Sequence, residues 1–433
     1  MIVAGDWLLP GDGEPLRDGA VLLRGPRIQE VAPREALVTA HPGEPVDHHA
    51  GCVITPGLVN AHTHLSLTVL RGLIPPGELA TWLRSVAKGI SAMRDDEFAA
   101  STTLGALECL EAGVTVVGDI VYGPEAAAAC GDAGLAGTYY WEVLGIEAAA
   151  LSRELARQEF PSGPGQCTTG RTRRGLTPHT PYTAGPDLLR AVHSEARRLG
   201  AGFAVHVAES LAELELLASG AGPFAETAAR LARGFSPPRT SAVAYLDVLG
   251  VLEDALAIHC VHLAEGDAAL LAAKVRAAVL CPRSNAVLGN GEPPVAGLAA
   301  AGVALALGTD SAASNADLDI LAEARAVAGI APRMTARRLM RMVTIEGAKA
   351  LGMDDEFGSL TAGKQADLAV FRVGATREPE EAIIRAGGRE TIEAVMSGGT
   401  WRMRECRHVF PTQSAQRAAD RARTVAQRAI ERS

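Results

Sequence analysis

Basic residues do not outnumber acidic ones in this chain, and no apolar run is long enough to cross a membrane. Of 433 residues, 41 are Lys or Arg and 50 are Asp or Glu, which gives a formal net charge of −9. Because the basic residues are also scattered, no positive patch suited to a nucleic-acid backbone is expected. The longest apolar run, Val295–Gly308, has 14 residues with two glycines inside it, against about 18 for a membrane helix. No charged-then-apolar signal segment opens the chain, so we expect a cytoplasmic protein with neither nucleic-acid nor membrane partners.

Paired cysteines are also lacking. The seven cysteines are widely separated, odd in number and without a CxxC pair, so we expect reduced residues of the core. With 48% hydrophobic and 21% charged residues, the chain has enough apolar side chains for a large core. Its length allows two or three domains, or one large barrel with an appendage.

Eight short apolar or β-branched runs, each ending in a polar residue, alternate with alanine- and leucine-rich helical stretches from about residue 54 onward. They are Val53–His64, Val114–Asp119, Thr138–Glu142, Gly175–His179, Phe203–Glu209, Ala255–His259, Ala277–Asn285 and Val303–Asp310. Such alternation is typical of parallel βαβ units, and eight units over about 250 residues match a (β/α)8 TIM-type barrel. The chemistry of these barrels lies at the carboxyl ends of the strands. Here those ends carry His62, His64, Asp119, Glu142, His179, His206, His259 and Asp310.

Both ends of the chain differ from this middle part. Residues 1–53 and 356–410 show short alternating strands with turn signals, and we expect them to form one small β-sandwich. The strands expected in the second stretch are Ala366–Phe371, Thr391–Met396 and Gly398–Met403. Residues 54–355 would then be the barrel. Residues 411–433 are predicted to be a tail whose polar, arginine-rich helix over Ala415–Ile430 packs on the barrel or on a partner.

Two histidines one residue apart end the first of the eight runs. In His62-Thr63-His64 the period of two along a strand sends both imidazoles to the same side, which is a metal-ligand spacing. His206 lies near the end of the fifth run and Asp310 ends the eighth. Three neutral imidazoles and one carboxylate suit one divalent ion, Zn²⁺ first and Fe²⁺ second, with one coordination position open to water. An open position predicts a catalytic site, because such an ion generates hydroxide near neutral pH.

Two further residues are placed for proton transfer. Glu209 follows His206 by three positions, where it can take a proton from the water and deliver it to a leaving amine. His259 ends the sixth run and is either a further ligand or a group that hydrogen-bonds the hydroxide or the developing oxyanion. These residues together predict a metal-assisted hydrolysis.

The same residues stand in motifs that extend over nearly the whole chain. The motifs are Pro56–Leu65, Leu70–Gly72, Pro178–Tyr182, His206–Glu209, His259–His262, Cys281–Asn285 and Gly308–Ser311. Through them the chain resembles the amidohydrolase superfamily, in its cytosine-deaminase-like and S-adenosylhomocysteine/methylthioadenosine-deaminase-like branch. The resemblance implies that one metal ion is bound by His62, His64, His206 and Asp310. It also implies that Glu209 carries protons, that His259 takes part in catalysis without binding the metal, and that His179 contacts the substrate.

Lysine scarcity bears on the number of metal ions. Binuclear members of the superfamily bridge two ions with a carboxylated lysine at the end of the fourth strand, where this chain has His179. Lysine occurs only at Lys88, Lys274, Lys349 and Lys364, none of which ends a predicted strand. The resemblance therefore implies a site for a single ion.

The resemblance also implies hydrolytic deamination of a cyclic amidine, and a 6-aminopurine is the substrate class that we favour. Gly118–Glu125 and Gly137–Val143 are similar to a subgroup that includes 6-aminodeoxyfutalosine deaminases, so an adenosine derivative of that kind is the best candidate. The alternatives among enzymes are a guanine, pterin or cytosine deaminase and a triazine chlorohydrolase. A non-catalytic scaffold with the same fold is the alternative from another class. The complete set of ligands argues against the scaffold, and Glu209 favours an amine as the leaving group.

The segment after the first strand is expected to cap the site. Similar adenosine-type deaminases hold the ribose with a glutamate of this segment. Counting along the chain from Trp82, the corresponding position in this sequence is Ser91. That departure argues against ordinary adenosine, methylthioadenosine and S-adenosylhomocysteine as substrates, unless a shifted loop lets Glu78 or Glu97 take the place of this glutamate. A substrate carboxylate would need a cation, for which this segment offers Arg84, Lys88 and Arg94.

The expected substrate contacts come from the capping segment and from the motifs given above. They are Trp82, Arg84 and His179, together with Ser284 and Asn285, for which a role in a turn is the equal alternative. The expected partner is a small-molecule substrate, and the resemblance and the helical tail are compatible with a homodimer.

Overall fold

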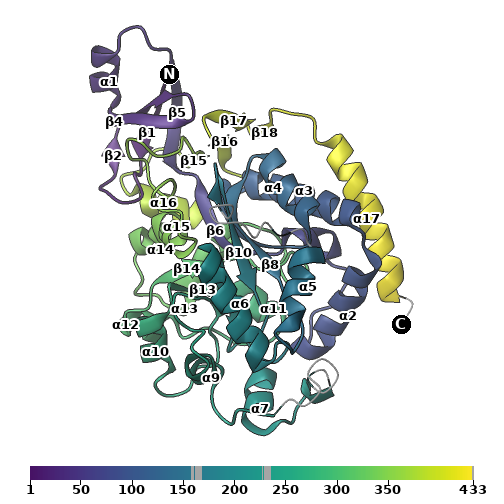
Figure 1. The fold of residues 1–433 in the computed structure, drawn as a ribbon. Helices are drawn as coiled ribbons and strands as arrows, with labels where there is room; N and C mark the ends of the chain where they lie inside the picture. The colour runs from purple at the N-terminus through teal and green to yellow at the C-terminus, as the bar shows by residue number, and fades with distance from the viewer. Residues whose placement is uncertain (158–159, 161–167, 227, 229–235, 432–433) are drawn as a thin grey trace.

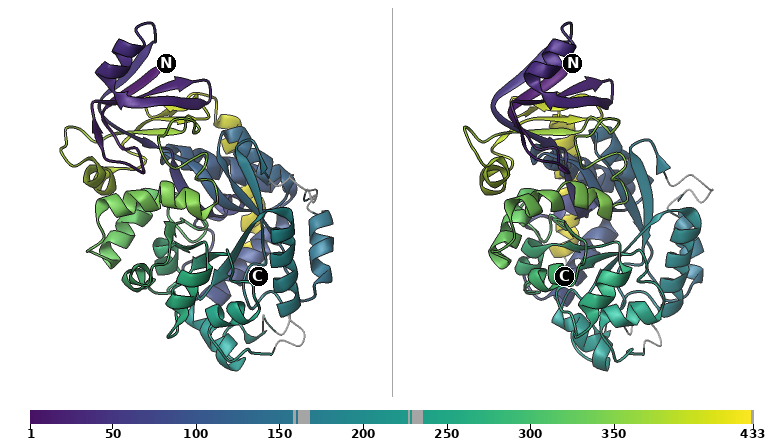
Figure 2. Two further views of the ribbon diagram at one scale, coloured as in Figure 1. Left: turned by 60° about the vertical axis from the view of Figure 1, so that its left-hand side comes forward. Right: turned by 90° about the vertical axis from the view of Figure 1, so that its left-hand side faces the viewer.

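Two sheets make up the framework of the computed structural model, which describes residues 1–157, 160, 168–226, 228 and 236–431 (Figure 1). One sheet is a nearly closed barrel of parallel strands from the middle of the chain. The other is a mixed sheet to which both ends of the chain contribute. The views of Figure 2 show the purple N-terminal strands and the yellow-green C-terminal strands together at one end of the barrel.

The eight barrel strands follow one another around the barrel in chain order. They are β6 (Leu58–Thr63), β7 (Val114–Val121), β8 (Ala136–Glu142), β10 (Thr172–Thr177), β11 (Gly202–Val207), β12 (Leu256–His259), β13 (Ala277–Leu280) and β14 (Leu305–Leu307). A short strand, β9 (Thr168–Thr169), pairs antiparallel with β10. Every residue of β7 is buried, because helices cover the outside of a parallel barrel and side chains fill its inside. The predicted barrel is therefore confirmed.

The barrel closes where its first and last strands meet. The Asp310 N–H donates to the His62 carbonyl at 3.0 Å, and the Thr309 N–H donates to Asn60 Oδ1 at 3.0 Å. The Asn60 amide returns a hydrogen bond to Thr309 Oγ1 at 2.7 Å. A Cβ at Gly308 would lie 2.7 Å from the Cβ of His62, so only glycine lets the strands approach this closely. Closure therefore brings two predicted metal ligands side by side.

Helices follow the strands and cover the outside of the barrel. The helix α6 (Pro186–Leu199) shows how the sequence sets their limits: a proline begins it, and Gly200 ends it in the left-handed conformation. Its leucines, Val192 and Ala196 face the core, while its arginines face solvent. The other helices of this part are α3 (Asp95–Glu111), α4 (Pro124–Ala133), α5 (Ala149–Arg157), α7 (Leu211–Ser219), α9 (Ala242–Val248), α10 (Asp267–Lys274), α11 (Pro282–Val287), α12 (Val295–Ala300), α13 (Ile320–Ile330), α14 (Ala336–Met342) and α15 (Ile345–Ala350).

The mixed sheet contains nine strands in the order β18-β17-β16-β15-β5-β1-β3-β4, with β2 paired to β1. Only the pairing of β1 with β5 is parallel. The strands are β1 (Ile2–Leu8), β2 (Leu16–Arg17), β3 (Gly19–Arg24), β4 (Arg27–Pro33), β5 (Val46–Pro56), β15 (Leu368–Arg372), β16 (Ile392–Ser397), β17 (Thr400–Arg404) and β18 (Arg407–His408), with helices α1 (Arg34–Ala40) and α16 (Pro379–Ala386) beside them. The pairing of β5 with β15 joins the two chain ends, as the alternating strand pattern of both stretches predicts.

The chain changes from the mixed sheet to the barrel in the middle of the first predicted run. β5 continues to Pro56, and β6 begins at Leu58. The Gly57 N–H donates to the Asp367 carbonyl of the mixed-sheet part, whereas the Leu58 N–H donates to the Gly113 carbonyl beside β7. Val53–His64 is thus two strands of two sheets rather than one, and the proline without an N–H stands at the change.

A capping segment lies over the carboxyl ends of the barrel strands. It consists of the 3-10 helix η1 (Leu65–Leu70) and the helix α2 (Leu79–Ala92). The last helix, α17 (Gln413–Glu431), packs along η1, α2 and α3 through buried alanines, and it forms the yellow edge of Figure 1. The arginine-rich helix predicted over Ala415–Ile430 therefore contacts the barrel of its own chain.

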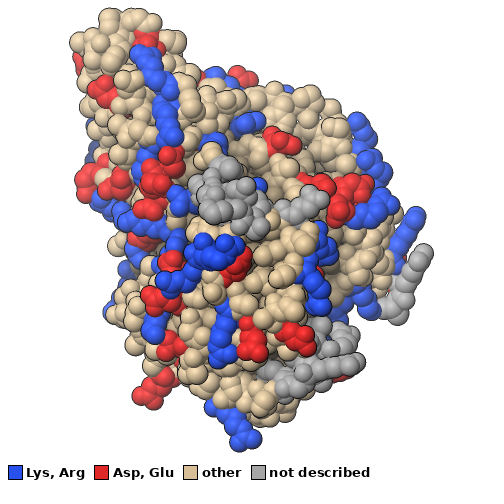
Figure 3. Space-filling model, viewed as in Figure 1, with Lys and Arg blue, Asp and Glu red and all other residues tan. Residues whose placement is uncertain are grey.

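Most of the described cysteines lie unpaired in the core. Cys52, Cys109, Cys130, Cys260 and Cys281 are buried and unpaired, as predicted, and Cys167 lies outside the described residues. Cys406 is exposed, so its predicted place in the core is wrong: it stands with Glu405 in the left-handed turn between β17 and β18. Charges of both signs alternate on the face drawn in Figure 3. Within the described residues, no helix has the length and apolar character needed to cross a membrane.

Candidate active site

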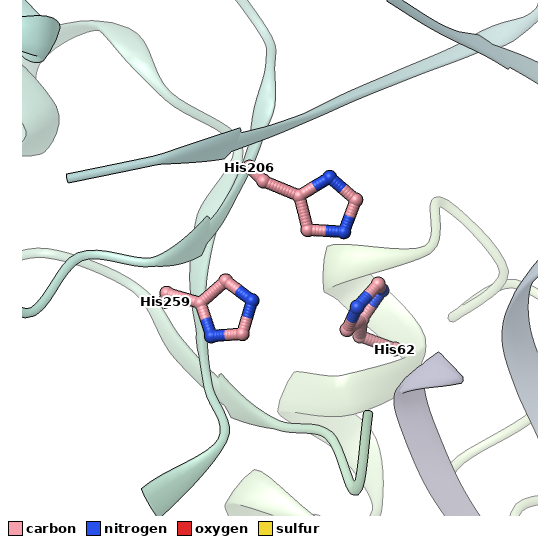
Figure 4. A group of neighbouring side chains, drawn as sticks. All are labelled: His62, His206 and His259. Atoms are coloured by element: carbon pink, nitrogen blue, oxygen red, sulfur yellow. The ribbon is translucent and has the colours of Figure 1, made fainter. Parts of the chain in front are cut away.

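Four histidines converge at the carboxyl ends of the barrel strands. His62 stands on β6, His64 directly follows it, His206 stands on β11 and His259 ends β12. The ring centroid of His62 lies 4.9 Å from that of His64, 5.0 Å from that of His206 and 6.0 Å from that of His259. Figure 4 shows the rings of His62, His206 and His259 pointing toward one common space.

Asp310 adds a carboxylate to this cluster. Its Oδ1 lies 3.5 Å from His62 Nε2 and 3.6 Å from His64 Nε2. Its Oδ2 accepts hydrogen bonds from Ser284 Oγ at 2.6 Å and Ser314 Oγ at 3.1 Å. Burial acts to raise the pKa of Asp310, but the imidazole of His62 beside it and the other surrounding imidazoles hold this pKa well below the ordinary value. The side chain is thus ionised and fixed in orientation.

Several of these side chains stand on strained backbone. His179, Ala208, His259 and Asp310 all have positive φ angles, of 67°, 54°, 78° and 58°, and each follows or ends a barrel strand. Non-glycine residues adopt this region at a cost, and such residues gather at functional sites. The residues that follow Ala208 and Asp310, which are Glu209 and Ser311, line the cavity in front of the cluster.

Burial keeps the imidazoles neutral, which metal ligation requires. It lowers the pKa of His64 to about 3, and it lowers the pKa values of His62, His206 and His259. His206 Nδ1 lies 3.0 Å from the carbonyl oxygen of His179, so this nitrogen carries the hydrogen and Nε2 presents a lone pair to the cluster. A backbone carbonyl in this position orients metal-binding histidines in the same way.

The donor set fits a divalent metal ion. Among the described residues, ligand atoms lie within 4.8 Å of one another in two groups, one of His62, His206 and His259 and one of His62, His64 and Asp310. His62 Nε2 is buried and has no hydrogen-bond partner among the described residues, which costs free energy unless another species binds there. Nitrogen donors with one carboxylate oxygen are the ligands that Zn²⁺ and Fe²⁺ accept.

Glu209 faces the same space from the loop after β11. Its Oε1 lies 3.8 Å from His259 Nε2 and accepts a hydrogen bond from Asn290 Nδ2 at 3.1 Å. Burial, with a smaller contribution from Asp310, raises the pKa of Glu209 to about 8. The Glu213 carboxyl holds the loop, because it accepts from the N–H groups of Ala208 at 3.0 Å and Glu209 at 2.8 Å.

His259 is oriented by Asn285, a residue predicted to contact substrate or to form a turn. His259 Nδ1 lies 3.0 Å from Asn285 Oδ1, so Nδ1 carries the hydrogen and Nε2 is left as an acceptor toward Glu209. Asn285 and Ser284 are both fully buried on α11, and neither lines the cavity in front of the histidines. Their side chains hydrogen-bond His259 and Asp310 from behind, and their contact with substrate stays a prediction.

A cavity opens in front of the cluster between the barrel mouth and the capping segment. Trp82, Arg84 and His179, which are three of the predicted substrate contacts, line it. Most of the remaining wall is apolar and comes from α2 and the loops after the strands, with Leu79, Val86, Ile90, Tyr182, Phe224 and Leu288 among its residues. His179 Nδ1 lies 2.8 Å from Thr183 Oγ1, which fixes the ring at the cavity wall.

The other polar residues of the capping segment do not line this cavity. Ser91 is exposed, and its hydroxyl donates to the Lys88 carbonyl at 2.9 Å. Glu78 caps α2 by accepting from the Ala80 N–H at 2.9 Å, and Glu97 accepts from the Arg94 N–H at the start of α3 at 2.8 Å. Glu78 and Glu97 therefore do not replace a glutamate at position 91 in this structure.

Sequence analysis did not single out three residues that support the site. The pattern Ser210-x-x-Glu213 is typical of a helix N-terminus and is a signal for Glu213. It does not indicate that the Glu213 carboxyl accepts from the N–H groups of Ala208 and Glu209, which precede the cap. Asn290 stands in an irregular loop and gives no local signal. Ser314 likewise follows the Asp310 motif without a spacing that marks it.

A parallel barrel with neutral imidazoles, a carboxylate and a proton-holding carboxyl at its carboxyl ends is the arrangement of a metal-dependent hydrolase. Comparison with known proteins agrees. The model of the amidohydrolase family matches residues 53–402. A 5-methylthioadenosine/S-adenosylhomocysteine deaminase of Pelotomaculum thermopropionicum is 35% identical over 363 residues, which cover 81% of this chain and 79% of that protein. A protein of the same name from Symbiobacterium thermophilum is 33% identical, with 86% and 85% covered.

Solved structures show the same fold. A zinc-bound adenosine deaminase from Xanthomonas campestris has a TM-score of 0.81 at 27% identity, with 98% of each chain covered. The aminofutalosine deaminase of Helicobacter pylori, in complex with methylthio-coformycin, has a TM-score of 0.80 at 22% identity, with 93% of this chain and all of that chain covered.

The chain therefore belongs to the amidohydrolase family. It is a hydrolase that acts on carbon–nitrogen bonds other than peptide bonds. Its cofactor is a single divalent metal ion, and zinc is the ion in the Xanthomonas campestris relative.

Proposed function

We propose that this protein is a purine-nucleoside deaminase that replaces the 6-amino group of an adenosine derivative with oxygen and releases ammonia. The observation that carries the proposal is the position of Glu209, a buried carboxyl that faces the imidazole cluster with its Oε1 3.8 Å from His259 Nε2. Loss of an amine requires a proton donor, whereas loss of chloride does not. The relatives named as deaminases support the same reaction class.

In this proposal His62, His64, His206 and Asp310 hold the metal ion. These residues stand on or directly after the first, fifth and eighth barrel strands. The imidazoles around Asp310 lower its pKa, so this carboxylate is ionised. When bound, the ion lowers the pKa of a water toward about 7 and so supplies a nucleophile at neutral pH. Ser284 and Ser314 hold the second oxygen of Asp310, which leaves Oδ1 directed at the histidines.

Protons move through Glu209 and His259. Glu209 takes a proton from the attacking water and delivers it to the departing amine, so that water and the aminopurine give the oxopurine and ammonia. His259 Nε2, left as an acceptor by the hydrogen bond of Nδ1 to Asn285, holds the hydroxyl hydrogen of the attacking oxygen in position. Asn290 and Glu213 keep the Glu209 carboxyl turned toward this space.

The particular substrate that we propose carries a carboxylate, as 6-aminodeoxyfutalosine does. Arg84 is the residue that supports it, since it lines the cavity while Lys88 and Arg94 do not. Its guanidinium donates to Thr81 Oγ1 at 2.9 Å and is exposed, so it can turn toward a ligand at the cavity mouth. Stacking on Trp82 and contact with His179 would place the purine over the reacting centre.

Ammonia release from a panel of aminopurines tests this proposal. We expect kcat/KM for aminodeoxyfutalosine to exceed that for adenosine, methylthioadenosine, guanine and cytosine. Arg84→Met should lower kcat/KM about 10- to 100-fold for the carboxylate-bearing substrate and leave adenosine within about twofold, because a charge-assisted hydrogen bond is lost only in the first case. Lys88→Met, a change of an exposed residue on the same helix, is the matched control. Adenosine turnover equal to or above that of aminodeoxyfutalosine would contradict the proposed substrate, and chloride release from a triazine in place of ammonia would contradict the reaction.

A further inference from the structure

Asp119 is a buried carboxyl on β7 that hydrogen-bonds the residues on either side of the proposed metal ligand His64. Its Oδ1 accepts from the Thr63 hydroxyl at 2.7 Å and from the Leu65 N–H at 2.8 Å. Asp119 does not line the cavity, and the proposed deamination gives it no step. Its contacts are therefore with the chain that carries a ligand and not with the reacting atoms.

The pairing of β6 with β7 is irregular at this point. Its register shifts between Asn60 and Thr63, and Thr63 then lies opposite Asp119. β6 ends at Thr63, and His64, with a φ of −128° and a ψ of 70°, leads the chain into η1. The regular strand ladder thus stops just before the ligand. Hydrogen bonds from a side chain have to hold the chain where the ladder no longer does.

Asp119 also satisfies the start of η1. The Leu65 N–H is the first N–H of this 3-10 helix, and such a donor has no partner within its own helix. His64 stands at the N-cap position, but its side chain makes no capping hydrogen bond. The Asp119 carboxyl takes that role from the neighbouring strand. It thereby fixes the chain after His64 as well as the chain before it.

His64 lacks the restraint that two other histidines of the cluster have on their rings. His206 Nδ1 lies 3.0 Å from a backbone carbonyl oxygen, and His259 Nδ1 lies 3.0 Å from an amide oxygen. In His64, Nε2 lies 3.6 Å from Asp310 Oδ1, while the buried Nδ1 has no hydrogen-bond partner among the described residues. Metal-binding histidines ordinarily owe their orientation to such a partner. The position of the His64 ring therefore depends on its backbone.

We propose that Asp119 is a positioning residue for the metal site, which fixes the backbone of His64 through Thr63 and Leu65 and so sets the affinity for zinc. The inference rests on the proposed ligand set and deepens it by naming the residue that holds one ligand in place. The property that it needs is one acceptor oxygen between two donors. Asp119 Oδ2 faces the Cys130 thiol, a weak donor, at 3.9 Å on the other side.

Competition for zinc between the protein and a chelating dye measures the affinity of the site without any turnover. We expect Asp119→Ala to weaken zinc binding about 10- to 100-fold, which is the usual effect of losing a residue that orients a ligand. Asp119→Asn keeps an acceptor oxygen, so its affinity should stay within about threefold of the wild type. Thr63→Val keeps the shape of the side chain and removes one of the two hydrogen bonds, so it should weaken binding about 3- to 10-fold.

Cys130→Ala separates positioning from a general loss of stability. The Cys130 side chain is fully buried beside Asp119 Oδ2, and its removal leaves the two hydrogen bonds of Oδ1 in place. We expect the melting temperature of the zinc-free protein to fall, because the lost sulfur leaves a cavity, while zinc affinity stays at the wild-type value. Melting temperatures of the other variants without metal show how far each change acts on the fold.

Three results would overturn the proposal. The first is wild-type zinc affinity in Asp119→Ala. The second is an Asp119→Asn variant that binds zinc as weakly as Asp119→Ala, since the charge and not the acceptor would then matter. The third is an equal loss of affinity in Cys130→Ala, because a loosened fold would explain both. If Asp119→Ala does not fold, Thr63→Val decides, and an affinity within about twofold of the wild type would refute the role of Asp119.

His64→Ala distinguishes this inference from the ligand set on which it rests. If that variant binds zinc as tightly as the wild type, the proposed ligand set fails first, and the inference fails with it. If His64→Ala loses zinc while Asp119→Ala and Thr63→Val keep it, only the role of Asp119 fails.

Discussion

Burial governs the protonation states of the residues around the site. It lowers the pKa of His64 to about 3 and raises the pKa values of Glu209 and Glu213 to about 8. The same loss of water acts in opposite directions on the two residue types, because each is driven toward its neutral form. Neutral imidazoles are available as ligands, and the raised pKa of Glu209 lets its carboxyl hold the proton that it takes from the attacking water until the proton passes to the leaving group.

The raised pKa of Glu213 gives the stability of the protein a dependence on pH. A carboxyl whose pKa is 4.5 in the unfolded chain and about 8 in the folded one stabilises the fold fully below the lower value, and this contribution is lost as the pH rises toward 8. Glutamine does not titrate, so Glu213→Gln should gain stability relative to the wild type between pH 5 and pH 8, at up to about 1.4 kcal/mol per pH unit. Melting temperatures of both proteins at a series of pH values measure the difference, and a gap that stays constant with pH would contradict it.

At the scale of residues, the positions at strand ends were predictable and the directions of side chains were not. His62, His64, His206, His259 and Asp310 come together as predicted, because the carboxyl ends of parallel strands meet at one end of a barrel. Ser284 and Asn285 also follow a strand, but the turn into α11 directs both behind the cavity. Spacing in the sequence does not record that rotation.

At the scale of elements, the last helix is connected to the capping segment by an arginine. Arg423 of α17 donates from Nη1 to the carbonyl oxygens of Val69 at 2.8 Å and Arg71 at 2.6 Å, where η1 ends. The η1 helix begins directly after His64, and α2, which contributes Trp82 to the cavity, packs against the same helix α17. Arg423 therefore acts as a positioning residue for the cavity wall.

Replacing Arg423 tests this connection. We expect Arg423→Met to raise KM several-fold and to leave kcat within about twofold, because the wall that holds the substrate loosens while the catalytic groups stay in place. Steady-state kinetics on the best substrate of the panel measure both constants. Arg421→Met, which changes an exposed residue of the same helix, serves as the control. A fall in kcat with unchanged KM would show that Arg423 supports the reacting groups instead.

The boundary between the two sheets could not be predicted to the residue. Val53–His64 is one continuous apolar run, and neither hydropathy nor β-propensity tells which sheet a buried strand joins. The structure divides the run at Pro56 and Gly57, where hydrogen bonds pass from one sheet to the other. Regular alternation of strands and helices, by contrast, determines the barrel, because right-handed parallel connections leave few other topologies.

At the scale of the whole molecule, the proposed metal site joins parts of the chain that are far apart in the sequence. Its residues stand on or after β6, β11 and β14, so the site exists only when the barrel has closed. The mixed sheet takes part indirectly, since the chain enters β6 from β5 and returns to the sheet at β15. Catalysis in this account depends on both features of the closed barrel, the bound ion and the carboxyl beside it.

Titration of the metal-free protein with zinc, with ammonia release followed on the same samples, tests this central claim most directly. The account predicts that ammonia release from an adenosine-type substrate rises linearly with zinc and stops rising at about one ion per chain. Glu209→Gln should bind the same amount of zinc and release ammonia about 10²- to 10⁴-fold more slowly, because only the proton carrier is changed. Full activity without metal, or undiminished activity in Glu209→Gln, would contradict the account.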